Sequence, residues 1–186
     1  MPEILIRPAT AVDVERLCAV AARTFRETYR PTCDPGEVED YVRDAFTPEA
    51  VGAWLDEHDA HTLLALLGSE VVGYARVRRG ATPAGVDGPE PVELVRLYVD
   101  ATLHGRGIGA ALMRACLDSA RALGARTIWL GAYEENRRAL AFYADWGFVP
   151  AGTRPFEFGG RIYADPVLQR ALSDDGLRPS GSGLRA

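Results

Sequence analysis

The stretch VELVRLYVDATLHGRGIG, residues Val92–Gly109, decides the fold of this 186-residue chain. It opens as an apolar strand that ends at Val99, and it closes with three glycines in the run GRGIG, residues 105–109. The helical apolar pattern of Ala110–Leu123 follows at once. Such a loop binds anions, because free backbone N–H groups and the positive end of the helix dipole meet there. We therefore expect a phosphate-bearing ligand at this loop.

The segments on both sides of this stretch indicate an α/β fold. Apolar periodicity predicts helices over 14–25, 38–45, 48–55 and 136–146, and strands over 3–7, 61–67, 70–78 and 127–130. A further strand starts at Phe148, and a final hairpin over 156–168 turns at Gly159-Gly160. The order predicts a central mixed, mostly antiparallel twisted sheet of about six or seven strands with helices on both faces. We expect residues 1–172 to form one domain and the polar, glycine-rich residues 173–186 to be a disordered tail.

The composition excludes several classes of protein. All 21 basic residues are Arg, so neither a P-loop NTPase nor a side-chain Schiff base is available. A formal net charge of −5 without a basic cluster argues against a nucleic-acid partner. No apolar run is long enough to span a membrane, and the N-terminus lacks a secretory pattern, so a cytoplasmic protein is expected. The three cysteines lack CxxC spacing, so no metal is expected.

The glycine loop also fits the GxGxxA pattern of dinucleotide-binding folds, at Gly105, Gly107 and Ala110. That pattern normally follows its strand directly, whereas residues 100–104 intervene here. The acidic residue expected at the end of the next strand is also missing, since Leu130-Gly131-Ala132 stands there. These features disfavour a dinucleotide and leave a purely structural turn as the alternative to a phosphate site.

A second motif, ENRRALAFYADWGF at residues 135–148, follows about thirty residues downstream. With this motif and LYVDATLHGRGIGAALM, residues 97–113, the chain resembles the GCN5-related N-acetyltransferase (GNAT) family over nearly its whole length. The resemblance implies the GNAT fold and transfer of an acetyl group from acetyl-CoA to an amine, without a metal. The family's Gln/Arg position before the glycines is His104 here, a departure that leaves a backbone contact intact.

The resemblance also implies which residues hold the cofactor. The strand before the glycine loop pairs with the pantetheine arm, and the loop's main-chain N–H groups hold the pyrophosphate. Asn136 matches the asparagine that contacts the cofactor near the thioester. The complete implied set is Leu97, Tyr98, Val99, His104, Gly105, Arg106, Gly107, Ile108, Gly109, Ala110 and Asn136.

Two residues are candidates for proton transfer. Tyr143 matches the family's general-acid tyrosine, which protonates or hydrogen-bonds the leaving thiolate; the alternative is a packing role beside Phe142 and Phe148. A primary amine is only about 1 part in 2,500 neutral at pH 7, so a base or a water chain is needed. Some relatives carry a Glu where this chain has Gly131. Glu93 is the better candidate here.

Strict alternation along the strand would place Glu93 on one face with Val95, Leu97 and Val99, as a cleft-facing carboxylate. It would then act as the base or anchor the substrate. The alternative is an ion pair with an arginine such as Arg76 or Arg96, and water is an alternative base.

The acceptor side is expected to be lined by the first helices and the final hairpin. Phe25–Tyr29, Tyr41 and Phe46 show a looser similarity to the polyamine and small-amine branch of the family, so a small-molecule primary amine is the expected acceptor. A non-catalytic acyl-CoA-binding or regulatory domain and a protein N-terminal or lysine acetyltransferase are the alternatives. A homodimer is left open.

Overall fold

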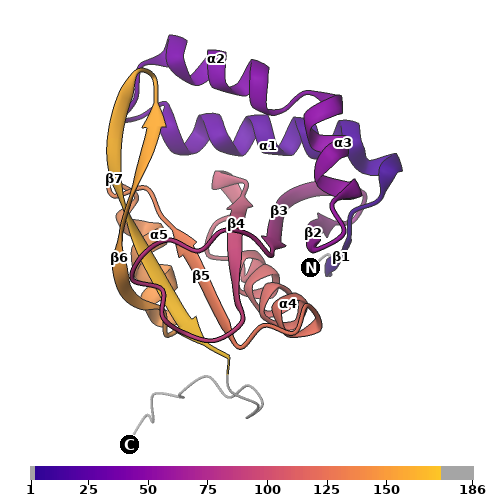
Figure 1. The fold of residues 1–186 in the computed structure, drawn as a ribbon. Helices are drawn as coiled ribbons and strands as arrows, with labels where there is room; N and C mark the ends of the chain where they lie inside the picture. Colours follow the sequence, from indigo (N-terminus) through magenta and orange to yellow (C-terminus); the bar gives the residue numbers. More distant parts are fainter. Residues whose placement is uncertain (1–2, 173–186) are drawn as a thin grey trace, which may run out of the picture.

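The computed structural model describes residues 3–172 and contains one seven-stranded sheet with helices on both faces (Figure 1). The strand order is β1-β2-β3-β4-β5-β7-β6. The strands are β1 (Ile4–Pro8), β2 (Ala60–Leu67), β3 (Glu70–Arg78), β4 (Pro91–Val99), β5 (Thr127–Gly131), β6 (Val149–Phe158) and β7 (Arg161–Ala171). The helices are η1 (Ala11–Asp13), α1 (Val14–Tyr29), α2 (Pro35–Ala45), α3 (Pro48–Asp56), η2 (Ala101–Leu103), α4 (Ile108–Ala122) and α5 (Arg137–Asp145).

The sheet opens in its middle. Every strand pair is antiparallel except β4 with β5, and this parallel pair holds only over Pro91–Glu93 against Thr127–Trp129. Beyond Glu93 the two strands run on without pairing. The second half of β4 therefore presents an edge with unpaired backbone groups inside the sheet, where an extended ligand can add hydrogen bonds.

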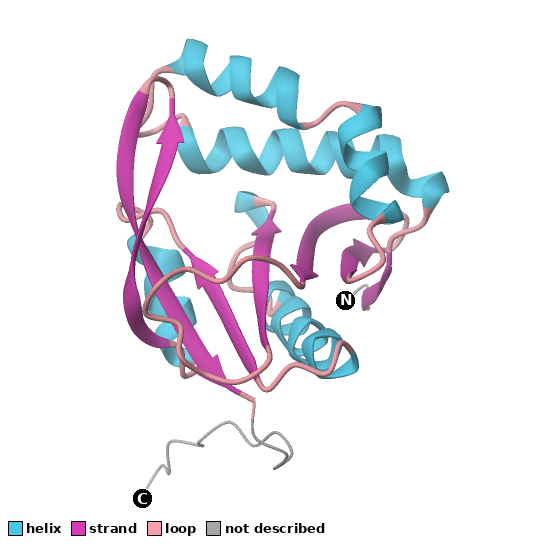
Figure 2. Cartoon of the chain, viewed as in Figure 1, coloured by secondary structure: helices cyan, strands magenta, loops and turns pink. Residues whose placement is uncertain are grey.

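Helices cover both faces of the sheet (Figure 2). Two hydrophobic clusters hold them there. Side chains of α4 and α5 pack on one face, and side chains of α1, α2 and α3 pack on the other. The opening between β4 and β5 thus lies between the start of α4 on one side and the aromatic side chains of α1 and α2 on the other.

The expected elements are confirmed, with shifts at their ends. Helix α2 begins at Pro35 and not at residue 38, because Asp34 caps it by accepting from the N–H groups of Gly36 and Glu37. The final hairpin turns at Gly159-Gly160 as expected, although its strands are longer. The predicted tail at 173–186 lies outside the described residues.

A β-bulge corrects the expected orientation of Glu93. Arg76 pairs with Arg96 while Val77 pairs with Leu94, so Val95 is an extra residue in β4. The bulge reverses the alternation beyond it. Glu93 therefore shares its face with Arg96 and Tyr98, on the side of α1, and the expected grouping of Glu93 with Val95, Leu97 and Val99 is wrong.

Candidate active site

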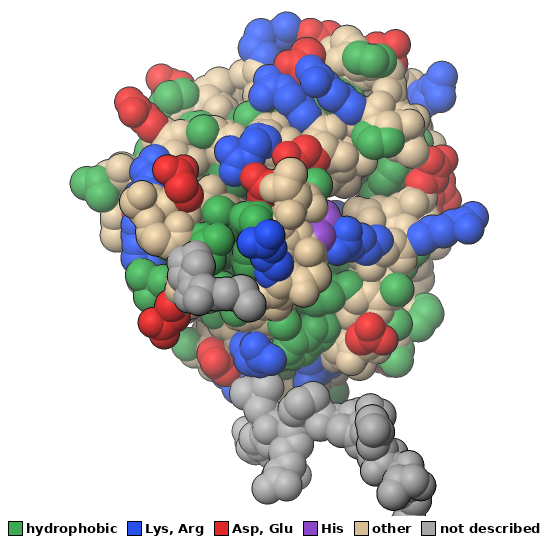
Figure 3. Space-filling view, turned by 180° about the vertical axis from the view of Figure 1, so that it is seen from behind, with side chains coloured by type: hydrophobic (Ala, Val, Ile, Leu, Met, Phe, Trp, Pro, Cys, Tyr) green, Lys and Arg blue, Asp and Glu red, His purple; other side chains and the backbone are tan. Residues whose placement is uncertain are grey.

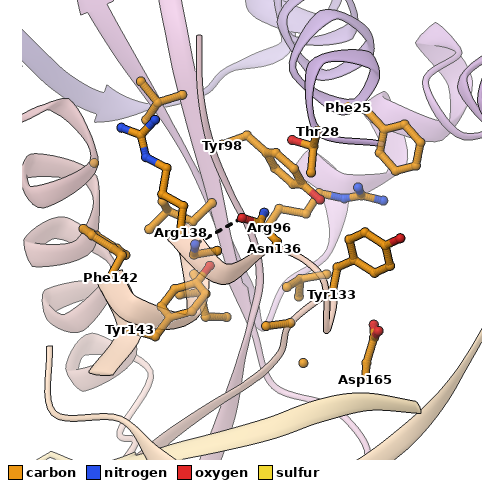
Figure 4. Close-up of a pocket in the computed structure, with 18 of the residues that line it drawn as sticks. Phe25, Thr28, Arg96, Tyr98, Tyr133, Asn136, Arg138, Phe142, Tyr143 and Asp165 are labelled. Carbon is orange, nitrogen blue, oxygen red and sulfur yellow. Dashed lines mark hydrogen bonds between the residues drawn. The ribbon is translucent and has the colours of Figure 1, made fainter. Parts of the chain in front are cut away.

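A cavity of about 690 Å³ passes through the opening between β4 and β5 (Figure 4). At one end it is lined by residues 103–105 and 107–110, in the loop and first turn that lead into α4, together with the start of α5. At the other end it is lined by α1, α2 and the final hairpin, as expected for an acceptor side. All eleven cofactor-binding residues implied by the sequence line the cavity except Arg106, which is exposed; Glu93 and Tyr143 line it too.

The glycine loop presents free donors to this cavity. Gly105 and Gly107 have φ angles of 80° and 83°, which side chains rarely adopt, and Gly107 is the N-cap of α4. The N–H of Ala111 makes the first helical bond, to the carbonyl of Gly107. The N–H groups of the three preceding residues, 108–110, therefore have no helical acceptor and point to where an anion would lie.

His104 joins this loop to β4 and α5. Its Nδ1 accepts from Nη1 of Arg138 at 2.5 Å, because a guanidinium can only donate. Its Nε2 therefore carries the proton and donates to the carbonyl of Val99 at 2.9 Å. This double contact is a physical reason for a histidine at this position.

The end of β4 leaves its backbone open toward β5. The N–H of Asp100 donates to the carbonyl of Val72 on β3, at 2.9 Å. Because backbone groups alternate in direction along a strand, those of Leu97 and Val99 face the opening. The side chains of Leu97 and Val99 pack toward α4, and that of Tyr98 packs toward α1.

Tyr143 and Asn136 lie together at the middle of the cavity (Figure 4). Oδ1 of Asn136 caps α5 by accepting from the N–H of Ala139 at 3.1 Å, which leaves the amide NH₂ free to donate. Tyr143 is 9% exposed, and its ring packs edge-on against Phe142 and Phe148. Burial raises the pKa of its phenol, so the hydroxyl keeps its proton well above neutral pH.

Glu93 is held by two arginines. Arg78 donates to its Oε2 at 3.0 Å, and Arg154 donates to its Oε1 at 2.9 Å. The ion pair left open by the sequence is present, but Arg76 pairs instead with Glu57 and Arg96 with none of the described carboxylates. Both oxygens of Glu93 are thus occupied by donors.

Aromatic side chains enclose the far end of the cavity, which we call the aromatic chamber. It is lined by Phe25, Tyr29, Tyr41, Arg96, Tyr98, Tyr133, Phe156 and Asp165. Phe25 stacks on Tyr29 and Tyr41 with ring centroids 4.3 and 4.4 Å apart. The chamber is therefore a small apolar-walled space with two opposite charges in its lining.

A charged group that the sequence did not indicate, Asp165, also lines the cavity. Its carboxylate is only 4% exposed, and its Oδ1 has no hydrogen-bond partner among the described residues. Burial raises its pKa to about 6, although the positive charge of Arg154 lowers it. No signal marked Asp165 in the sequence, because it stands in an ordinary hairpin strand and becomes notable only once β7 is placed beside the opening.

No cluster of potential metal ligands is found within residues 3–172. In the same residues, no helix is long and apolar enough to cross a bilayer. Figure 3 shows acidic and basic side chains interspersed over the back of the molecule. Many of the charges are paired, as in Arg26–Glu39 and Arg121–Asp118.

Comparison with known proteins agrees with this geometry. Residues 22–148 match the acetyltransferase (GNAT) family. An uncharacterized N-acetyltransferase of Mycobacterium tuberculosis (strain H37Rv) is 36% identical over 160 residues, covering 86% of this chain and 98% of the relative. The N-alpha-acetyltransferase RimI of the same organism is 36% identical over 112 residues, covering 60% of this chain and 66% of RimI.

Among solved structures, the PaiA N-acetyltransferase of Thermoplasma acidophilum in complex with coenzyme A has a TM-score of 0.75 at 21% identity. The likeness covers 91% of this chain and 99% of PaiA. Fold and sequence together define an N-acetyltransferase. The chain belongs to the GNAT family.

Proposed function

We propose that this protein transfers the acetyl group of acetyl-CoA to the primary amine of a small molecule by direct attack of the amine on the thioester. The observation that carries the proposal is the single cavity that joins three parts. They are the free N–H groups at the start of α4, the open edge of β4, and the aromatic chamber. A phosphate group, an extended arm and an amine fit these parts in that order.

The cofactor would follow the backbone. The N–H groups of residues 108–110 and the glycine loop bind the pyrophosphate. The open backbone groups of Leu97 and the N–H of Val99, whose carbonyl already accepts from His104, pair with the pantetheine arm as a strand pairs with an extended peptide. The thioester then reaches the middle of the cavity, where Asn136 and Tyr143 lie. PaiA, a protein of the same fold, is known in complex with coenzyme A, which supports this placement.

Tyr143 is the proposed proton donor to the leaving thiolate. Full transfer from a phenol to a thiolate is uphill by roughly 2 kcal/mol with ordinary pKa values, and burial of Tyr143 increases that cost. The hydroxyl therefore acts chiefly as a hydrogen-bond donor to the negative charge that develops on sulfur.

The base proposed from the sequence was Glu93 or water. Because two guanidinium groups occupy both oxygens of Glu93, a direct role would require one of them to move away. We propose instead that Glu93 positions Arg78 and Arg154, and that the proton leaves through water or through the other carboxylate of the cavity. The next subsection treats that carboxylate.

The similarity to RimI keeps protein N-termini as a second class of acceptor. RimI covers only 60% of this chain, and the buried chamber favours a compact acceptor over a chain that must continue outward. A non-catalytic acyl-CoA-binding domain is the third possibility, and the presence of Tyr143 and Asn136 at the centre of the cavity speaks against it.

Calorimetry with acetyl-CoA and turnover of Tyr143→Phe test the proposal together. We expect the native chain to bind acetyl-CoA, and we expect Tyr143→Phe to keep that affinity while kcat falls by about 10- to 100-fold. Absence of acetyl-CoA binding would refute the whole proposal. Unchanged kcat in the variant would refute the role of Tyr143 alone.

A further inference from the structure

A buried carboxylate, Asp165, and a half-buried guanidinium, Arg96, line the aromatic chamber without ion partners among the described residues. Asp165 reaches it from β7, and Arg96 reaches it from β4 just beyond the bulge at Val95 (Figure 4). Among the described residues, neither side chain makes a salt bridge within 4.0 Å. Charges removed from water are rarely left unpaired, because no ion pair then offsets the free energy of desolvation.

Arg96 is held in place by contacts that leave its charge uncompensated. Its guanidinium lies 4.8 Å from the ring centroid of Trp54 and 5.2 Å from that of Phe46. Its one hydrogen bond joins Nη2 to the hydroxyl of Tyr41 at 3.4 Å, a long contact. The aromatic rings orient the guanidinium and stabilise it partly, while most of its N–H donors remain available.

The charge of Asp165 is also only partly compensated. Its Oδ1 lacks a partner, although the backbone N–H of Glu134 and the charge of Arg154 favour its ionised form. Arg154 is already engaged with Glu93. The other titratable groups that act on Asp165 are the carboxylate of Glu134, whose negative charge raises the pKa of Asp165, and the buried phenols of Tyr29 and Tyr98. None of these groups neutralises the carboxylate directly.

Tyr98 lines the same chamber, and both charges act on its phenol. Burial raises the pKa of its phenol, the positive charge of Arg96 lowers it, and the negative charge of Asp165 raises it. Both charges therefore act on one ring, yet they do not pair with each other. A small molecule placed against Tyr98 can meet Arg96 and Asp165 at once.

We propose that the acceptor of this enzyme is a zwitterion, a small primary amine that also carries an anionic group such as a carboxylate, with Asp165 binding the ammonium and Arg96 binding the anion. This assignment rests on the proposed function and names its substrate class. It differs from the polyamine class suggested by the sequence. The positive charge of Arg96 in the same chamber disfavours a polycation, which has no anionic group to pair with it.

Binding by Asp165 also starts the reaction. The carboxylate accepts one proton from the ammonium, so the amine becomes neutral and its lone pair attacks the thioester carbonyl. The C–S bond breaks, the thiolate takes up a proton, and the new amide nitrogen loses its second proton to water. Asp165 then releases its own proton to solvent, so one proton is produced per acetyl group transferred.

The test compares acceptors that differ only in the anionic group. Release of CoA is measured with 4-aminobutanoate and n-butylamine, with α- and β-amino acids and their matched amines, and with 1,4-diaminobutane. We expect kcat/KM to be about 10-fold or more higher for the best amino acid than for its matched amine. Arg96→Gln should reduce that ratio by about 10-fold or more, and Arg96→Lys should restore part of it. Asp165→Asn should lower kcat/KM for acids and amines together.

Arg114→Gln is the matched control. Arg114 also lies near an aromatic ring, that of Trp146 at 5.8 Å, but outside the cavity. The Arg114→Gln change should leave the ratio of kcat/KM between amino acid and matched amine as it is in the native chain. Acetyl-CoA binding by each variant shows that it is folded. A higher kcat/KM for the diamine or the plain amine than for the amino acid overturns the zwitterion assignment alone. So does an Arg96→Gln variant whose kcat/KM falls equally for the amino acid and for its matched amine. CoA release with none of these amines overturns the proposed function as well.

Discussion

The guanidinium of Arg154 lies directly over the Cα atom of Gly131. A Cβ atom on residue 131 would overlap the guanidinium, which reaches past this glycine to bind Glu93 at 2.9 Å. The position at which some relatives carry a catalytic Glu is thus filled here by an arginine from β6. The glycine and the Glu93–Arg154 ion pair are parts of one arrangement.

This relationship predicts a coupling between the two positions. Gly131→Ala should displace Arg154 and cost about 1–3 kcal/mol of unfolding free energy, because the buried carboxylate of Glu93 loses one of its two arginine partners. In an Arg154→Ala background the same change should cost much less. Chemical denaturation of the two single variants and the double variant measures the coupling, and additive losses would show that the contact has no energetic weight.

The backbone of Gly107 should be needed for the cofactor. Its φ of 83° makes Gly107→Ala strained by about 1–2 kcal/mol, and relaxation of the loop would misplace the N–H donors of α4. We expect a clear rise in the Kd of acetyl-CoA by calorimetry. Gly52→Ala is the control, since Gly52 lies inside α3 with open space beside it. It should stabilise the fold by about 0.5–1 kcal/mol and leave the Kd as it is. Equal Kd values in both variants would contradict this role of Gly107.

His104 should contribute to affinity and not to the chemical step. His104→Ala removes its bonds to Val99 and Arg138, so the loop must become ordered when the cofactor binds. We expect the Kd of acetyl-CoA to rise by about 3- to 10-fold with kcat retained. A variant with native Kd would mean that the glycine loop holds its shape without His104.

Asp165 should lower stability while it supports activity. Its folded-state pKa of about 6 lies above the ordinary value of 3.8, so the charged carboxylate destabilises the folded chain above pH 6. That penalty disappears as the pH falls from 6 towards 3.8. Asp165→Asn should therefore raise the unfolding free energy by up to about 3 kcal/mol at pH 7 and by much less at pH 4.

The same variant should lose activity. Because Asp165 must be ionised to bind an ammonium, kcat/KM of the native enzyme should decrease as the pH drops below about 6. The Asp165→Asn variant should not show this decrease. A variant that is more stable and less active identifies a group kept for function. Destabilisation at pH 7 together with native kcat/KM would show that Asp165 is only structural.

Much of the fold was predictable because local patterns agree with the tertiary structure. The strand at Val92–Val99, the glycine loop and α5 each have signals within a few residues, and the cofactor end of the cavity depends on these elements. Ten of the eleven residues implied there line the cavity. This end is built mostly from backbone groups, whose positions follow from strands, turns and helix starts.

The acceptor end was less predictable because it depends on side chains from distant strands. One extra residue, Val95, turns Glu93, Arg96 and Tyr98 to the same face, and strict alternation cannot reveal it. Arg154 and Asp165 meet the cavity only because β6 and β7 pack beside β5. Ion partners chosen from the sequence, Arg76 and Arg96, were wrong for the same reason.

The central claim is that one cavity joins acetyl-CoA to a primary amine, and the most direct measurement is amine-dependent release of CoA with mass analysis of the product. We predict CoA release that requires the amine, a product heavier by one acetyl group on nitrogen, and a loss of about 10- to 100-fold in kcat for Tyr143→Phe with acetyl-CoA affinity kept. Tight binding of acetyl-CoA without release of CoA for any small amine, amino acid or peptide would contradict the account.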